Sequence, residues 1–93
     1  MSSSPEPDLP LSELTTGRWA TVRGVLPDAQ GREDELMLRL MEIGFVPGEQ
    51  VRITAAGWPG REPLAVRVGH TTFALRRYEA ERIRVAAGAD DAR

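Results

Sequence analysis

Several residue types that carry chemistry in other proteins are missing or rare in this sequence. The chain of 93 residues contains no cysteine and no lysine, and its one histidine is His70. Without cysteine there is neither a disulfide nor a thiolate metal site, and one imidazole cannot fill a tetrahedral zinc or iron site. Neither phosphate-binding pattern, G-x-x-x-x-G-K-S/T or G-x-G-x-x-G, occurs. We therefore expect a protein that is not an enzyme and that requires no cofactor.

Long apolar runs and concentrated basic charge are absent as well. No stretch is long and apolar enough to span a bilayer, and residues 1–4 lack the basic and apolar regions of a secretory signal. The net charge is −2, and all twelve basic residues are arginine. A mildly acidic domain is a poor general binder of nucleic acid. We expect a cytoplasmic protein that binds no nucleic acid and reaches a membrane only through a partner.

Composition divides the chain into one domain and two tails. Residues 1–8 are rich in serine and proline, and residues 87–93 are small or charged. Such segments bury too little apolar surface to offset the entropy lost on ordering, so both are predicted to be disordered. Residues 9–86 remain as a single domain, close to the lower size at which one core suffices.

The stretch from residue 36 to residue 53 predicts a helix that leads into a strand. Leu36, Leu40 and Ile43 fall on one helical stripe, which Met37 and Met41 widen. Gly44 follows the stripe, where a helix needs a residue that tolerates positive φ. A Pro-Gly pair at 47–48 then turns the chain into an alternating strand that places Val51, Ile53 and Ala55 on one face.

Four further strands are predicted around this unit. In the first, Ala20, Val22 and Leu26 share one face, and Gly24 suggests a bulge. The predicted strands cover residues 19–26, 49–56, 64–69, 72–75 and 83–85, with one helical turn at 76–81. Five short strands with a helix between the first and second predict a mainly β fold, an SH3-like small barrel. A parallel βαβ arrangement is the alternative, but the later connections are too short for crossovers.

These segments resemble one known family. The resemblance rests on residues 11–14 (LSEL), 39–48 (RLMEIGFVPG), 51–53 (VRI), 74–76 (ALR) and 79–85 (EAERIRV). Together they resemble the ferrous-iron-transport protein A family, FeoA. The resemblance implies an SH3-like barrel and a cytoplasmic accessory role beside FeoB, the membrane ferrous iron transporter that carries a G-protein domain. The same barrel resembles the C-terminal domain of metal-dependent repressors, which leaves a role in modulating transcription as an alternative.

Five residues are candidates for contact with such a partner. Trp58 lies in a loop among glycine and proline residues, where it could anchor a partner or fold back over the mouth of the barrel. Arg61 in the same loop, with Arg76 and Arg77, could supply charged contacts. Leu38 falls on the outward side of the predicted helix, and an apolar patch would form if it met Phe45, Val46 or Leu14.

A metal site is predicted only at the surface. His70 lies in a predicted turn, where it is either a solvated side chain or a surface or intermolecular ligand for an adventitious divalent transition metal. A metal bridge there could join two copies into a weak homodimer. The acidic run at 33–35 fits the first turn of a helix better than a metal patch.

Overall fold

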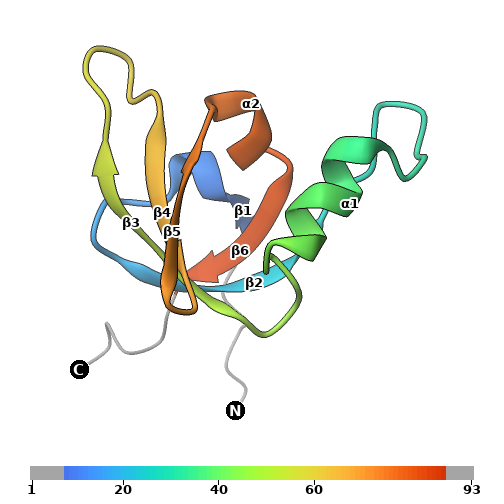
Figure 1. Cartoon of the computed structure of the whole chain (residues 1–93), viewed down its shortest axis with the longest axis horizontal. Helices are drawn as coiled ribbons and strands as arrows, with labels where there is room; N and C mark the ends of the chain where they lie inside the picture. Colours follow the sequence, from blue (N-terminus) through green and yellow to red (C-terminus); the bar gives the residue numbers. More distant parts are fainter. Residues whose placement is uncertain (1–7, 88–93) are drawn as a thin grey trace.

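The computed structural model describes residues 8–87, which form one antiparallel sheet with three short helical elements (Figure 1). The elements in chain order are β1 (Asp8–Pro10), the 3₁₀ helix η1 (Leu11–Glu13), β2 (Trp19–Val25), α1 (Glu35–Glu42), β3 (Gln50–Ala56), β4 (Leu64–Val68), β5 (Thr71–Leu75), α2 (Arg77–Ala80) and β6 (Ile83–Ala87). The strand order is β1-β6-β2-β3-β4-β5. The predicted tails lie outside the described residues except at their inner ends, where Asp8 and Ala87 belong to strands.

The sheet contains one strand more than the sequence predicted. Residues 8–87 form six strands, because β1 precedes η1 and pairs with β6 through Leu9 and Val85. Three residues that end in a proline carry no alternating pattern, so β1 could not be recognised from the sequence. The helix α1 therefore lies between the second and third strands. Every strand pair is antiparallel, which rules out the βαβ alternative.

Two β-bulges, one in β2 and one in β3, change which side chains face the core from those that the sequence predicted. In β2 the register shifts between Val22 and Gly24, as the glycine predicted. Val25 is therefore buried, whereas Leu26, expected inside, is 44% exposed. In β3 a second shift follows Ile53, so Ala55 is exposed although alternation placed it with the core. A one-residue slip reverses the side-chain face, which simple alternation cannot anticipate.

Helix α1 begins and ends where its capping residues predict. The Asp34 carboxylate accepts a hydrogen bond from the backbone N–H of Met37 at 3.1 Å. Gly44 ends the helix at φ 127°. Leu40 is buried, while Met41, expected to widen the buried stripe, is exposed. The helix therefore contributes a narrower stripe to the core than its sequence suggested.

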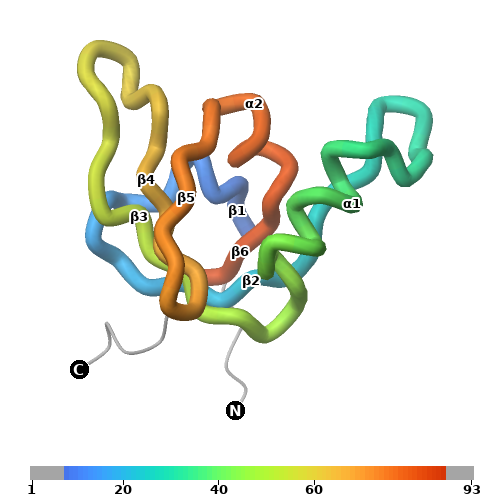
Figure 2. The backbone as a smooth tube through the Cα atoms, viewed as in Figure 1, coloured from blue at the N-terminus to red at the C-terminus, as the bar shows by residue number. Residues whose placement is uncertain are grey.

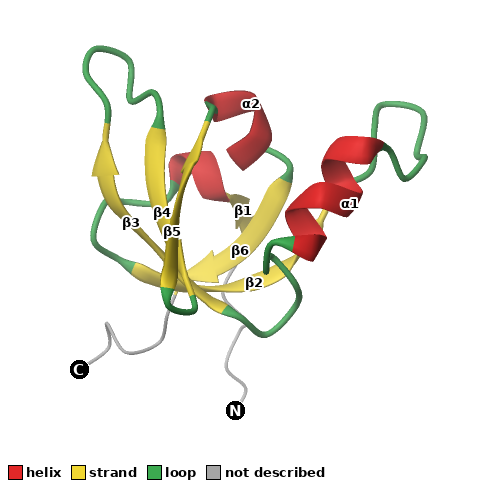
Figure 3. Cartoon of the chain, viewed as in Figure 1, coloured by secondary structure: helices red, strands yellow, loops and turns green. Residues whose placement is uncertain are grey.

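The core lies between the sheet and the helical elements that cover it (Figure 3). Leu11, the first residue of η1, and Leu14, directly after it, are fully buried. Phe45 packs against Phe73 with ring centroids 6.3 Å apart. Further buried residues come from β2, β3, β4, β6 and the last position of β5. They include Ala20, Val22, Val51, Ile53, Leu64, Val66, Leu75, Ile83 and Val85.

Candidate functional site

The loop between β3 and β4 carries the most exposed large hydrophobic side chain among residues 8–87. This Trp58 loop (residues 57–63) projects beyond the strands that it joins (Figure 2). Trp58 is 92% exposed, so it stands in solvent and does not fold back over the barrel mouth. Trp19, at the start of β2, is half-buried with the Arg52 guanidinium 4.8 Å from its ring centroid.

The base of the Trp58 loop is closed tightly. The backbone N–H of Gly57 donates to the carbonyl of Pro63 at 2.9 Å. A Cβ atom on residue 57 would lie 2.0 Å from the carbonyl oxygen of Glu62, so only glycine fits there. The loop therefore leaves and re-enters the sheet through a narrow neck.

Two arginines tie the loop to the rest of the barrel. One guanidinium N–H of Arg77 donates to the carbonyl of Gly60 at 2.6 Å, and its backbone N–H donates to the Glu62 carboxylate. Arg61 donates to the carbonyl of Leu14 at 3.2 Å. The loop is thus fixed to α2 on one side and to the segment after η1 on the other. Trp58 therefore lies on a loop that hydrogen bonds hold in place on both sides.

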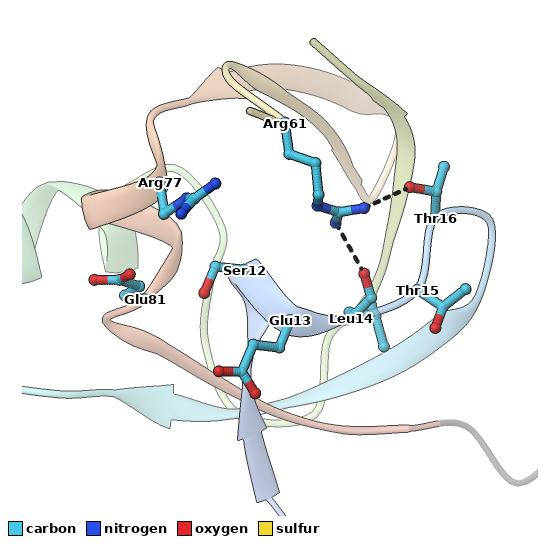
Figure 4. A pocket seen from close by; sticks show the side chains of 8 residues that line it. All are labelled: Ser12, Glu13, Leu14, Thr15, Thr16, Arg61, Arg77 and Glu81. Carbon is cyan, nitrogen blue, oxygen red and sulfur yellow. Dashed lines mark hydrogen bonds between the residues drawn. The ribbon is translucent and has the colours of Figure 1, made fainter. Parts of the chain in front are cut away.

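A polar cleft of about 610 Å³ lies beneath these arginines (Figure 4). Its lining residues are Ser12, Glu13, Leu14, Thr15, Thr16, Arg61, Arg77 and Glu81. The guanidinium of Arg61 also donates to the Thr16 hydroxyl at 3.4 Å. Only the two arginines of this set were candidates from the sequence. The others are residues 12–16, in and after η1, and Glu81, directly after α2, and nothing in their spacing indicates that they meet.

The remaining candidates for partner contact occupy two places. Arg76 is exposed next to Arg77, and its backbone N–H donates to the Glu79 carboxylate at 2.8 Å. Leu38 is 50% exposed, as predicted, but α1 lies across the molecule from the Trp58 loop (Figure 1). An apolar patch of Leu38 with Phe45 or Leu14 does not form, because the latter two are buried. The exposed apolar side chain that accompanies it on α1 is Met41.

An ion pair that the sequence did not reveal fixes the start of α1. Arg82 donates to both oxygens of Asp34, at 2.6 and 3.2 Å, and to the carbonyl of Leu26 at 2.9 Å. The hydrogen bond from Arg82 and that from the Met37 N–H lower the pKa of Asp34 to about 2. The central acid of the run at 33–35 therefore caps α1, in keeping with the expectation that this run belongs to a helix start, whereas its ion pair with Arg82 was not predicted.

His70 lies in the exposed turn between β4 and β5. Within residues 8–87 no group of three or more histidine, aspartate and glutamate side chains is placed to hold a metal ion. Over the same residues, no helix is long and apolar enough to cross a bilayer. A ligand role for His70 would need further donors from outside residues 8–87 or from a second molecule.

Fold and site together define an SH3-like small barrel that displays a braced loop with an exposed tryptophan. The chain belongs to the FeoA family, since the sequence pattern of the FeoA domain matches residues 9–87. This family is associated with ferrous iron transport, and the match confirms the predicted resemblance. No curated protein matches the sequence.

Solved structures of FeoA proteins match over most of this chain. FeoA of Stenotrophomonas maltophilia, determined with zinc, is 46% identical over 86% of this chain and 89% of its own, with a TM-score of 0.70. It is described as an SH3-domain protein proposed to activate bacterial ferrous iron transport. FeoA of Chlorobium tepidum is 31% identical over 87% of this chain and 71% of its own, with a TM-score of 0.71.

The barrel is also similar to part of a metal-dependent repressor. A manganese-dependent transcriptional repressor is 21% identical over 92% of this chain but only 44% of its own, with a TM-score of 0.73. This likeness shows a common fold and carries no further argument about function.

Proposed function

We propose that this chain is a non-enzymatic, cytoplasmic accessory protein of ferrous iron uptake that docks on the cytoplasmic region of FeoB and regulates it. Membership of the FeoA family supports the setting. The observation that supports docking is the position of Trp58, which is 92% exposed on a loop braced by Arg61 and Arg77. Tryptophan and arginine are the residues most enriched at the energetic centres of interfaces.

The bracing matters for affinity as well as for position. A loop that is ordered before binding loses little conformational entropy when it docks. Arg76 and Arg77 are both exposed, and it is the guanidinium of Arg77 that binds the Gly60 carbonyl and holds the loop near Trp58. We therefore assign Trp58 to direct contact, Arg61 and Arg77 to contact and bracing together, and Arg76 to a peripheral charged contact.

Calorimetry with the soluble cytoplasmic region of FeoB tests the docking surface. Trp58→Ala should weaken binding by about 30-fold or more, the loss of roughly 2 kcal/mol that defines a hot spot. Leu26→Ala is a control, because Leu26 is an exposed apolar residue just after β2 that lines neither this cleft nor the pocket between α1 and α2. Its affinity should stay near that of the wild type. Absence of binding by the wild type would refute docking.

Leu38 supplies a second proposed contact on a separate face. Leu38→Glu places a charge on an exposed position of α1, so it should weaken binding by about 5-fold if this face also meets FeoB. If both Leu38→Glu and Trp58→Ala bind like the wild type, neither proposed surface takes part.

We further propose that no resident cofactor is needed and that His70 offers only a weak surface site for a divalent transition metal. A single exposed imidazole supplies one ligand of the four that a tetrahedral site requires. Titration of the protein with ferrous ion should give weak binding that His70→Ala abolishes. Micromolar, one-to-one binding by the monomer would instead favour metal binding as the function.

A further inference from the structure

Strand β5 forms an unprotected edge of the sheet. Within residues 8–87 it pairs only with β4, and no backbone hydrogen bond from the described loops reaches Thr71–Leu75. Its sequence, TTFAL, contains no charge and no proline, and its pairing with β4 has no bulge. Exposed edges of this kind are templates for pairing with another strand, and proteins usually guard them with charge, proline or a bulge.

The opposite edge of the sheet shows the usual protection. Strand β1 has only three residues and ends at Pro10, which cannot donate a backbone hydrogen bond. It begins at the charged Asp8, whose carboxylate lies 3.4 Å from the guanidinium of Arg23. The two edges of one sheet therefore differ in the features that prevent strand addition.

The side chains of β5 also suit a partner strand. Thr72 and Ala74 are small, uncharged and exposed. Phe73, midway along the strand, packs against Phe45 but remains only half-buried. A strand added beside β5 would cover the rest of the Phe73 ring and complete the edge of the core.

We propose that the strand which pairs with β5 is β5 of a second copy, in antiparallel orientation about a two-fold axis at Phe73. In this register Phe73 faces its own counterpart, and Thr72 of each copy faces Ala74 of the other. No like charges oppose each other, so the edge is complementary to itself, as a closed two-fold dimer requires. A five-residue ribbon is a short interface, so the dimer is weak and depends on concentration.

This dimer is distinct from one bridged by metal at His70. His70 precedes Phe73 by three residues, so the two copies of His70 would lie about 20 Å apart, six residues of extended chain. No single ion spans that distance. The edge dimer therefore forms without metal and without the imidazole, and it does not depend on the proposed docking to FeoB.

A pair of charge variants tests the register directly. Thr72→Glu with Ala74→Glu would place carboxylates opposite each other in both halves of the ribbon, whereas Thr72→Glu with Ala74→Lys would place opposite charges there. Both variants put a carboxylate beside the exposed Arg67, the cross-strand neighbour of Thr72 within one copy. The two chains should thus fold alike, which thermal unfolding would verify.

Sedimentation equilibrium from about 10 μM to about 1 mM measures the outcome. The wild type and the Glu–Lys variant should dimerise, and the Glu–Glu variant should dimerise at least about 10-fold more weakly. His70→Ala and added chelator should leave the dimer unchanged. A wild type that stays monomeric throughout, a Glu–Glu variant that dimerises like the wild type, or a dimer lost with His70 would each overturn the proposal.

Discussion

Asp34 shows how one side chain can stabilise a helix locally and attach it to the fold. Its carboxylate accepts from the Met37 N–H inside α1 and from Arg82, which follows α2. Arg82 also holds the Leu26 carbonyl, so a single guanidinium joins the start of α1 to the chain after β2. The sequence indicates the cap through its position before the apolar stripe, but the spacing of 48 residues between the pair hides the ion pair.

The ion pair between Asp34 and Arg82 predicts how the free energy of unfolding depends on pH. The pKa of Asp34 is about 2 in the folded chain, against an ordinary value of 3.8. Unfolding therefore takes up a proton between about pH 4 and about pH 2, and the stabilisation present above that range is lost as the pH falls through the folded pKa. Asp34→Asn keeps a capping side chain but cannot ionise, so its deficit in stability should shrink across this range.

Denaturant unfolding at neutral pH, near pH 4 and near pH 2 checks this expectation. Arg82→Gln should also weaken the pH dependence of stability between about pH 4 and about pH 2, because it removes the partner that lowers the pKa of Asp34. A constant difference between the wild type and Asp34→Asn over the whole range would contradict the assignment of the pKa shift.

At the scale of elements, α1 carries one leucine that the fold needs and another that it does not need. Leu40 is buried, whereas Leu38 is 50% exposed on the same helix. Leu40→Ala should lower the free energy of unfolding by about 2–5 kcal/mol through the lost contacts and the cavity left behind. Leu38→Ala should change it by less than about 0.5 kcal/mol. Urea midpoints of the two variants give the comparison, and equal losses would show that Leu38 supports the fold.

What the sequence predicts of these elements follows from how local their causes are. The apolar stripe of α1 and its end at Gly44 are local features and were predicted, and the acidic run at 33–35 was placed at the helix start without identifying Asp34 as the cap. The bulge near Gly24 was indicated by the glycine, but the bulge after Ile53 has no such marker. Strand β1 exists because β6 offers a partner more than 70 residues away, which no local pattern records.

The same reasoning applies to the candidate site. Trp58 and Arg61 stood out because they lie together in a loop rich in glycine and proline. Their tie to Leu14 and to Arg77 arises only when the barrel closes and brings η1 and α2 beside the loop. The cleft could therefore not be assembled from the sequence, although the two arginines that line it could be named.

At the scale of the whole molecule, strand β1 closes the sheet that the core depends on. It covers β6 at the outer edge, where Asp8, Leu9 and Pro10 face Ala86, Val85 and Arg84. Leu9 packs against the buried cluster, and Arg84 donates to the Asp8 carbonyl at 3.3 Å. Every buried residue of the core lies between positions 11 and 85, so β1 acts as a cover for the core and contributes no fully buried side chain.

Two fragments test how much β1 contributes to the stability of the fold. The fragment 8–87 keeps every described strand, so its melting temperature should match that of the full chain within about 2 °C. The fragment 11–87 lacks β1, exposes the free edge of β6 and loses the packing of Leu9. Its melting temperature should fall by about 5–10 °C, the consequence of losing roughly 1–2 kcal/mol from a domain of this size. Equal melting temperatures for the two fragments would mean that β1 contributes nothing to stability, whereas a lower value for 8–87 than for the full chain would place stabilising contacts outside the described residues.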